Sequence, residues 1–206
     1  MGLFQNLIET YGKCSEAVGI VQTDADGNSD ERKTLLPVFH MTFKSEICVI
    51  INEYGEFVNA GRDNKEKTII IPCTENSLGG RTSNPAPHPL CDQLDYVGGI
   101  NDKKLNDYLS VLKSWKNDIL ELNAIYTYVS GKTMLSDLIK RDIFNDGEYK
   151  TSNGDSEKSL DNEKIRKLGV RFVVQINGRM EKVWESESLR NAWINHVSAD
   201  TACDNT

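Results

Sequence analysis

The hydrophobic pattern of this chain changes from strand-like to helix-like across one glycine- and proline-rich stretch, residues 73–89. Before this stretch, residues 36–72 contain short runs of β-branched and aromatic residues, which are typical of strands. After it, residues 90–142 repeat apolar side chains at helical spacing. Strands gathered in one part of a chain and helices in another are typical of α+β proteins. We therefore predict an α+β fold in which a mostly antiparallel sheet packs against a helical segment.

The predicted sheet draws on two parts of the chain. In the first part, strands are expected at residues 37–44, 47–52, 56–61 and 67–72, with a tight turn at Glu53-Tyr54-Gly55. In the second part, strands are expected at residues 170–176 and 180–184. Asn177-Gly178 lies between these last two runs and is the strongest short hairpin signal in the chain, because both positions of a type I′ turn need a positive φ.

The predicted helices cover residues 3–19, the stretch around Leu105 to Trp115, residues 118–130, residues 133–142 and residues 186–197. Leu105, Tyr108, Leu109, Leu112 and Trp115 recur at the spacing of one helix face. An aromatic and leucine stripe of this kind indicates a face packed in the core.

Residues 73–89 form a predicted arch loop with two unlike halves. Thr74 to Asn84 is rich in Gly, Ser, Asn and Thr, whereas Pro85, Pro87 and Pro89 make the second half stiff and extended. A glycine-rich arch on a rigid stem can present backbone N–H groups to a ligand. It is equally consistent with an ordinary connection between a sheet and a helix.

The length of 206 residues predicts a single domain over residues 1–206. Hydrophobic residues make up 38% of the chain, which is enough for a core and excludes wholesale disorder. Within that domain, we expect residues 145–163 to form a flexible loop, because they are rich in Asn, Asp, Gly and Ser. Residues 198–206 are expected to be a small polar tail.

The charge of the chain argues against nucleic-acid binding by this chain alone. Lys and Arg number 24 against 31 Asp and Glu, a net charge of −7, and no basic stripe is visible. That balance leaves room only for a local basic patch. No apolar run is long enough to span a bilayer, and the N-terminus lacks a basic region followed by an apolar stretch. We expect a cytoplasmic protein with no membrane partner.

Metal binding is weakly supported. The five cysteines are odd in number and widely spaced, which is typical of reduced thiols. Cys73, His88 and Cys91 could supply three ligands, but a structural zinc site needs four and no CxxC pair is present. The thiols are better explained as core or loop residues, and we expect no metal and no other cofactor.

Catalytic signatures are missing as well. The chain has no P-loop, GxSxG, HExxH or GxGxxG motif. His88 and Cys91 lie three residues apart and could form a dyad, but no third group that would orient the base can be named. We therefore expect the protein not to be an enzyme, and an unrelated or diverged enzyme remains only the weakest alternative.

One long block of sequence is distinctive, and shorter matches accompany it. The block runs Thr68-Ile69-Ile70-Ile71-Pro72-Cys73-Thr74-Glu75, continues through Ser77, Arg81, Ser83 and Pro85, and ends in Pro87-His88-Pro89-Leu90-Cys91-Asp92 and Leu94-Asp95-Tyr96-Val97. The shorter matches are Leu3-Phe4-Gln5, Leu35-Leu36-Pro37, Tyr108 with Leu112 and Trp115, and Ala192-Trp193-Ile194. Together they resemble the N-terminal part of the large subunit of the type I-C (Dvulg-subtype) CRISPR-associated Cascade effector.

The resemblance implies a role in that effector. The large subunit lies beside the subunit that holds the 5′ end of the guide RNA, reads the short protospacer-adjacent motif (PAM) and helps to open the duplex, while base pairing reads the remaining sequence. Implied partners are therefore the guide-RNA-end-binding and backbone subunits of type I-C Cascade, with a target-DNA contact near the PAM. Ser77, Arg81, Ser83 and Asn84 are the implied DNA-proximal positions. The alternative is that these four residues only stabilise the loop.

Two functions compete under this resemblance. Family members are much longer than this chain, which starts at Met1 and ends in a polar tail that resembles a finished terminus. These features and the acidic balance favour a short homologue, carried by a phage or mobile element, that docks on the effector and antagonises its assembly or its recognition of target DNA, as an anti-CRISPR-like competitor would. The alternative is the excised N-terminal PAM-recognition domain of a working large subunit that takes part in antiviral defence.

Overall fold

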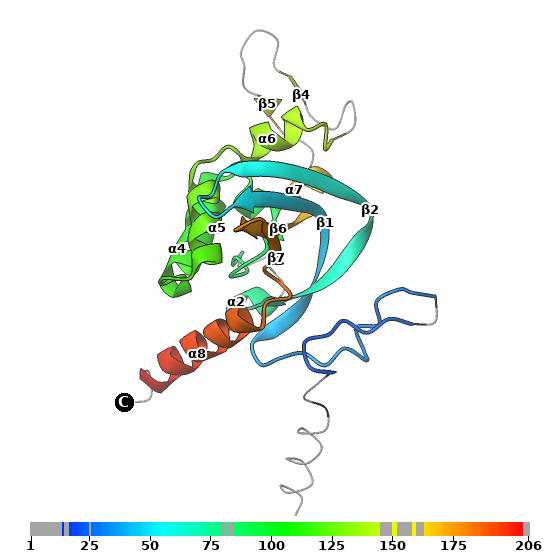
Figure 1. The fold of residues 1–206 in the computed structure, drawn as a ribbon, viewed down its shortest axis with the longest axis vertical. Coiled ribbons are helices and arrows are strands. Elements are labelled where there is room, and N and C mark those ends of the chain that lie inside the picture. Colours follow the sequence, from blue (N-terminus) through cyan, green and yellow to red (C-terminus); the bar gives the residue numbers. More distant parts are fainter. Residues whose placement is uncertain are drawn as a thin grey trace, which may run out of the picture.

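A computed structural model of the chain describes residues 14, 17–24, 26–79, 81, 85–144, 150–151, 158–159 and 163–203. Within this part of the chain, a five-stranded sheet packs against helices (Figure 1). The strands are β1 (His40–Asn52), β2 (Phe57–Pro72), β3 (Asp92–Gln93), β6 (Gly169–Ile176) and β7 (Arg179–Lys182). The helices are α2 (Glu75–Leu78), α3 (Leu94–Val97), α4 (Asp102–Trp115), α5 (Leu120–Ser130), α6 (Met134–Lys140), α7 (Glu163–Arg166) and α8 (Glu187–Cys203).

The sheet is mostly antiparallel, as predicted. Its order is β2-β1-β6-β3, and β7 also pairs with β6. The pairs β1–β2, β3–β6 and β6–β7 are antiparallel, whereas β1 and β6 run parallel. The parallel pair joins segments more than a hundred residues apart, and local pattern gave no sign of it. The prediction of an α+β fold is confirmed.

The four strands predicted over residues 37–72 are in fact two long strands. β1 and β2 pair along nearly their full length, with a register shift between Ser45 and Ile47. The polar residues between the strands predicted at 56–61 and 67–72 belong to β2, which lies at the edge of the sheet, where polar side chains can face water. Asn52 Oδ1 accepts the backbone N–H groups of Tyr54 and Glu56 at 3.0 and 2.9 Å and so closes the hairpin turn.

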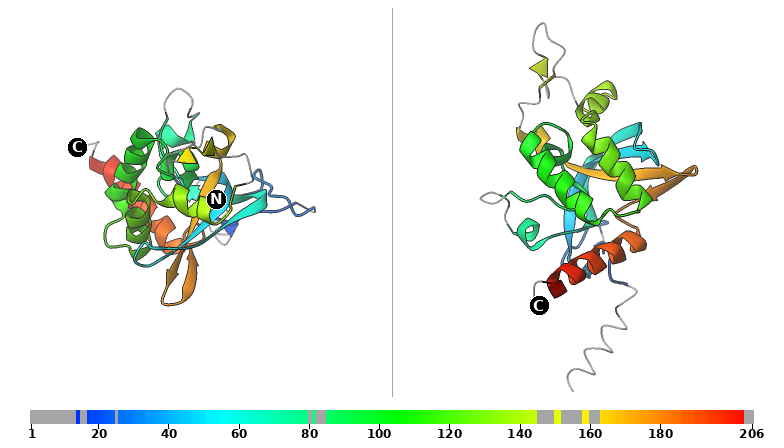
Figure 2. Two further views of the ribbon diagram at one scale, coloured as in Figure 1. Left: turned by 90° about the horizontal axis from the view of Figure 1, so that it is seen from above. Right: turned by 90° about the vertical axis from the view of Figure 1, so that its left-hand side faces the viewer.

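The helical half follows the predicted pattern. Leu105, Tyr108, Leu112 and Trp115 of α4 are buried in the core, as the stripe predicted. The helices expected at 118–130 and 133–142 correspond to α5 and α6. β1 contributes Ile47, Val49 and Ile51 to the same core, and α5 packs against β1 and β6 (Figures 1 and 2).

The C-terminal region contains the expected hairpin and one correction. Asn177 and Gly178 both have positive φ, 48° and 79°, and connect β6 to β7. The tail predicted at residues 198–206 is instead helical as far as Cys203, because α8 continues to that residue. Small polar residues do not end a helix by themselves, and no Gly or Pro interrupts this stretch.

Two predictions fall largely outside the described residues. Of the helix expected at 3–19, the structure describes Cys14, which is helical, and residues 17–19, where Val18 forms a β-bridge with Leu35. Of the flexible loop expected at 145–163, the structure describes a short antiparallel pair, β4 (Lys150–Thr151) with β5 (Lys158–Ser159), and the start of α7. No helix within the described segments has the length and apolar character that a bilayer span requires.

Candidate functional site

The arch begins with the short helix α2, whose N-terminus is capped by the side chains of Thr74 and Ser77. Ser77 N–H donates to Thr74 Oγ1 at 3.1 Å, and Thr74 N–H donates to Ser77 Oγ at 2.9 Å. This reciprocal capping box satisfies two backbone donors at the start of the helix. The Ser77 side chain is therefore buried and turned toward its own helix.

Arg81 fastens the arch to the body of the protein. Its Nη1 donates to both carboxylate oxygens of Asp92, at 2.7 and 3.0 Å, and to the carbonyl oxygen of Ala86 at 3.2 Å. Asp92 lies on β3 and is fully buried, so the Arg81 guanidinium links the arch to the sheet.

Asp92 also organises the backbone around it. Its oxygens accept the N–H groups of His88 and Gln93, each at 2.7 Å. Burial raises the pKa of Asp92 to about 6, while the charge of Arg81 and these hydrogen bonds act in the opposite direction. The carboxylate therefore stays charged at neutral pH only because Arg81 and the surrounding N–H groups compensate it.

The proline stem of the arch is packed into the core. Pro87 to Leu90 are buried, Trp115 Nε1 donates to the carbonyl of Pro89 at 3.3 Å, and Tyr108 Oη donates to the carbonyl of Leu90 at 2.7 Å. Both donors belong to the buried face of α4. The arch thus rises from a stem that the helical half holds in place.

A group of charged residues surrounds the base of the arch. We call it the arch-base cluster; it consists of Arg81, Asp92, Asp95, Tyr96, Lys104 and Arg166. The Arg81 guanidinium lies 4.7 Å and the Lys104 ammonium 4.9 Å from the centroid of the Tyr96 ring, both within cation–π range.

Asp95 joins the other two cations of the cluster. It accepts a hydrogen bond from Lys104 of α4 and another from Arg166 Nε of α7 at 2.8 Å, and it forms an ion pair with Arg166 Nη2 at 2.6 Å. Burial alone would raise the pKa of Asp95, but the hydrogen bonds from Lys104 and Arg166 outweigh it and hold the pKa below its ordinary value. The carboxylate is therefore ionised at neutral pH and ties three elements together.

Burial keeps the side chains considered for zinc or for a catalytic dyad in their neutral forms. Burial raises the pKa of the Cys73 thiol to about 11 and that of Cys91 to about 12, and burial lowers the pKa of His88 to about 3, with the charge of Arg81 adding to this. A cysteine that acts as a nucleophile usually has a lowered thiol pKa. His88 instead packs edge-on against Phe43, with ring centroids 5.6 Å apart. Within the described residues, no group of three or more His, Cys, Asp or Glu could hold a metal ion.

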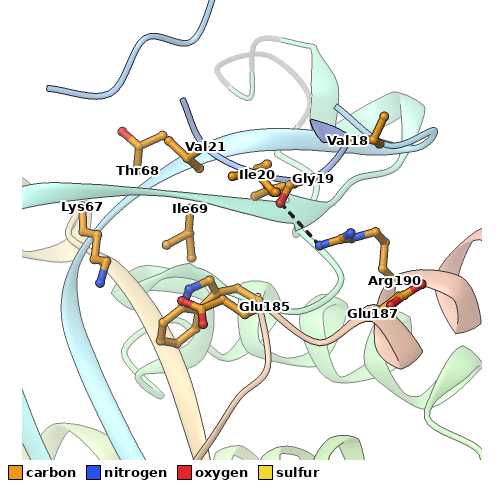
Figure 3. A pocket seen from close by; sticks show the side chains of 12 residues that line it. Val18, Gly19, Ile20, Val21, Lys67, Thr68, Ile69, Glu185, Glu187 and Arg190 are labelled. Carbon is orange, nitrogen blue, oxygen red and sulfur yellow. Dashed lines mark hydrogen bonds between the residues drawn. The ribbon is translucent and has the colours of Figure 1, made fainter. Parts of the chain in front are cut away.

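A separate groove of about 670 Å³ lies where the N-terminal segment, the end of β2 and the start of α8 meet (Figure 3). Its lining mixes apolar residues with Lys67, Glu185, Glu187 and Arg190. Arg190 reaches from α8 to the N-terminal segment, where its Nη2 donates to the carbonyl of Gly19 at 3.5 Å (Figure 3). Two of these side chains are cationic and two are anionic, so the lining carries charges of both signs.

An exposed apolar surface adjoins this groove. Its residues are Ile20, Leu35, Leu36, Val38 and Phe39, all large hydrophobic side chains exposed to solvent. The Val18–Leu35 bridge brings the two segments side by side. Large apolar side chains exposed on neighbouring segments are a common mark of a protein–protein contact.

The predicted DNA-proximal residues are only partly placed. Ser77 and Arg81 are described, and Ser77 Oγ and Arg81 Nη1 both form hydrogen bonds within the protein itself. Ser83 and Asn84 lie outside the described residues. Asp92, Asp95 and Tyr96 stood inside the distinctive sequence block, but their role was not foreseen. Lys104 and Arg166 carried no signal, because only the fold brings them to Asp95.

Comparison with known proteins is consistent with the resemblance of the sequence. The family model for CRISPR-associated protein (Cas_Csd1) matches residues 19–206. A search of curated proteins finds no match to the chain.

Proposed function

The chain belongs to the Cas_Csd1 family of CRISPR-associated proteins, the type I-C large subunits, and we propose that it acts as the PAM-recognition module of such an effector. In this role it docks among the guide-RNA-end-binding and backbone subunits and presents its arch to the target duplex. The buried Arg81–Asp92 ion pair is the observation that carries the proposal, because it fixes the arch on a rigid stem. Reading a few bases needs such preorganised contacts, whereas base pairing with the guide reads the rest.

The positions of Ser77 and Arg81 refine the roles proposed for the arch. Arg81 is committed to Asp92 and Ser77 to its capping box, so both are positioning residues that hold the arch in shape. In this proposal, the remaining residues of the loop, including Ser83 and Asn84, make the contacts to DNA. Arginine is a frequent reader of guanine, but Arg81 would have to leave a buried carboxylate unpaired in order to do so.

The exposed apolar surface is the proposed docking face. Its large hydrophobic residues lie next to a groove of mixed charge, and protein interfaces commonly combine an apolar centre with a polar rim. We propose a role without turnover, because the raised pKa of Cys91 and the neutral His88 disfavour the one dyad that the sequence offers.

The test is reconstitution with a guide-bound type I-C effector that lacks its own large subunit. We expect the chain to co-purify with the backbone subunits and to increase binding of a target duplex that carries the correct PAM over one with a scrambled PAM. Failure to co-purify would refute the proposal. Co-purification with no PAM preference would refute the recognition role.

The net charge of −7 favours a second candidate, an antagonist that occupies the place of the large subunit. In cells with an intact effector, such a competitor would lower interference, and overexpression of the full-length large subunit would restore it by mass action. A recognition module without competing activity would leave interference unchanged. The cellular assay therefore separates the two functions.

A further inference from the structure

The arch-base cluster arranges its charges in two layers. The side chains of Asp92 and Asp95 are 0% and 9% exposed, whereas those of Arg81, Lys104 and Arg166 are 15%, 28% and 32% exposed. The carboxylates thus lie beneath the cations. A ligand that approaches from solvent meets a positive surface, although the chain as a whole is acidic.

The local charge is positive in sum as well. The cluster has three cationic side chains and two carboxylates, so its formal net charge is +1. Two acidic residues close to the cluster in the chain are paired with lysines outside it: Glu163 with Lys167 and Asp102 with Lys132, each at 2.6 Å. Each of these pairs is formally neutral, so the two pairs do not change the formal charge of the cluster.

The cations are also held in fixed positions. Asp95 lies on α3, which is buried, and clamps Lys104 and Arg166 from two other elements. An ammonium carries three N–H donors and a guanidinium five, so the bonds to Asp95 use only some of them. The remaining donors of fixed side chains can bind an anion without paying the full entropy of ordering them.

We propose that the arch-base cluster binds a phosphodiester of the DNA backbone next to the bases that the arch reads. This inference rests on the proposed function, because it takes its ligand from the duplex presented to the arch. Arginine and lysine on one face are the usual phosphate contacts, and such contacts set the register of a protein on DNA without reading its sequence. In Figure 2 (right), α7, α4 and α2 lie along the same side of the molecule, so one DNA backbone passing this side can meet the cluster and the arch together.

The experiment measures binding of the isolated full chain to a fluorescent DNA duplex of arbitrary sequence across a range of salt concentrations. Lys104→Gln and Arg166→Gln are each expected to weaken binding about fivefold at physiological salt and to reduce the salt slope by about one. Arg166→Lys keeps the charge and is expected to keep the slope. Thermal unfolding of each variant identifies any that fail to fold, in which case the remaining Gln variant decides.

Lys182→Gln is the matched control, since Lys182 is an exposed lysine of β7 that pairs with Glu185 and does not belong to the arch-base cluster. An unchanged slope in this control and a reduced slope in the cluster variants support the site. The site would be overturned if all variants had the same salt slope, or if the cluster variants lost no more DNA affinity than Lys182→Gln does. Tighter binding of single-stranded RNA than of the duplex would also overturn it. Because no effector subunit is present, this outcome does not depend on whether the chain docks.

Discussion

At the scale of single residues, the base of the arch depends on charges that are buried and compensated. Asp92 has no exposure to water and is neutralised by Arg81 and two backbone N–H groups. A buried ion pair contributes little net stability when intact but costs much when one partner is removed. The position of the arch and the stability of the protein are therefore linked through one carboxylate.

Removal of Arg81 tests this link. Arg81→Met is expected to lower the free energy of unfolding by about 3 kcal/mol, because Asp92 then remains buried without a counter-charge. Adding Asp92→Asn to that variant should recover part of the loss, since it removes the orphaned charge. Urea unfolding measures both variants. Lys182→Met, which breaks an exposed pair, serves as the control and should leave the midpoint unchanged. A midpoint for Arg81→Met equal to that of wild type would contradict the prediction.

His88 makes stability depend on pH. Burial lowers its pKa to about 3 in the folded protein, against about 6.5 when unfolded, so only the unfolded state gains a proton between these values. Its contribution to stability is complete above about pH 6.5 and is lost as the pH falls, by about 2 kcal/mol at about pH 5. His88→Phe should remove this loss, which appears as a pH-dependent difference between the two unfolding free energies.

The pKa of Asp92 is raised to about 6, so this residue stabilises the folded protein as the pH falls, which opposes the effect of His88. The test therefore depends on the difference in unfolding free energy between His88→Phe and wild type at each pH, and not on either pH profile alone. Phe43→Leu alters the same aromatic contact without removing a titratable group and should give a difference that does not vary with pH. If the unfolding free energies of His88→Phe and wild type changed with pH in the same way, His88 would not be the cause of the pH dependence.

At the scale of secondary-structure elements, the parallel pairing of β1 with β6 decides how the two halves of the chain join. The strands meet closely at Gly169, where an added Cβ would lie 2.1 Å from the carbonyl oxygen of Lys44. No side chain fits there without displacing backbone. The sheet therefore needs glycine at this position because of close approach.

Gly169→Ala is expected to cost about 3 kcal/mol of stability, because the backbone of β1 or β6 must shift. Gly61 in β2 is a matched control, since it lies in a strand but an added Cβ would meet nothing within 4 Å. Gly61→Ala should be neutral or slightly stabilising. Chemical unfolding of the two variants gives the comparison, and equal stabilities would show that β6 adapts without cost.

At the scale of the whole molecule, the proposed reading and docking faces are built differently. The arch is fixed by buried polar contacts, whereas the surface around Val38 is exposed and apolar. A few anchors usually carry most of the energy of an interface. A charge placed on the apolar surface should therefore impair docking without changing the arch.

Val38→Glu is expected to reduce co-purification with the effector subunits at least tenfold, because it buries a carboxylate in the interface. Met180→Glu is the control: Met180 is 53% exposed and Val38 54%, so the two changes are alike in exposure. Binding of the isolated chain to DNA should be the same for both variants. Equal loss of docking by the two variants, or none by Val38→Glu, would remove this surface as the docking face.

Local pattern was sufficient for much of this architecture. The apolar spacing of Leu105, Tyr108, Leu112 and Trp115 predicted the buried face of α4, and Asn177-Gly178 predicted the β6–β7 turn. Both features could be predicted because helical periodicity and turn conformation depend on residues that are close together in the sequence. The distinctive block around the arch likewise indicated the family.

Tertiary structure alone decided how distant residues combine. The sequence does not show that β1 runs parallel to β6, that Arg81 is committed to Asp92, or that Arg166 reaches Asp95 from 71 residues away. A charged side chain is compatible with many partners, and which one it meets depends on which buried carboxylate the packed core brings within reach. Sequence thus determined the elements and the family, while packing determined that Arg81 holds the arch and which cations stand beside it.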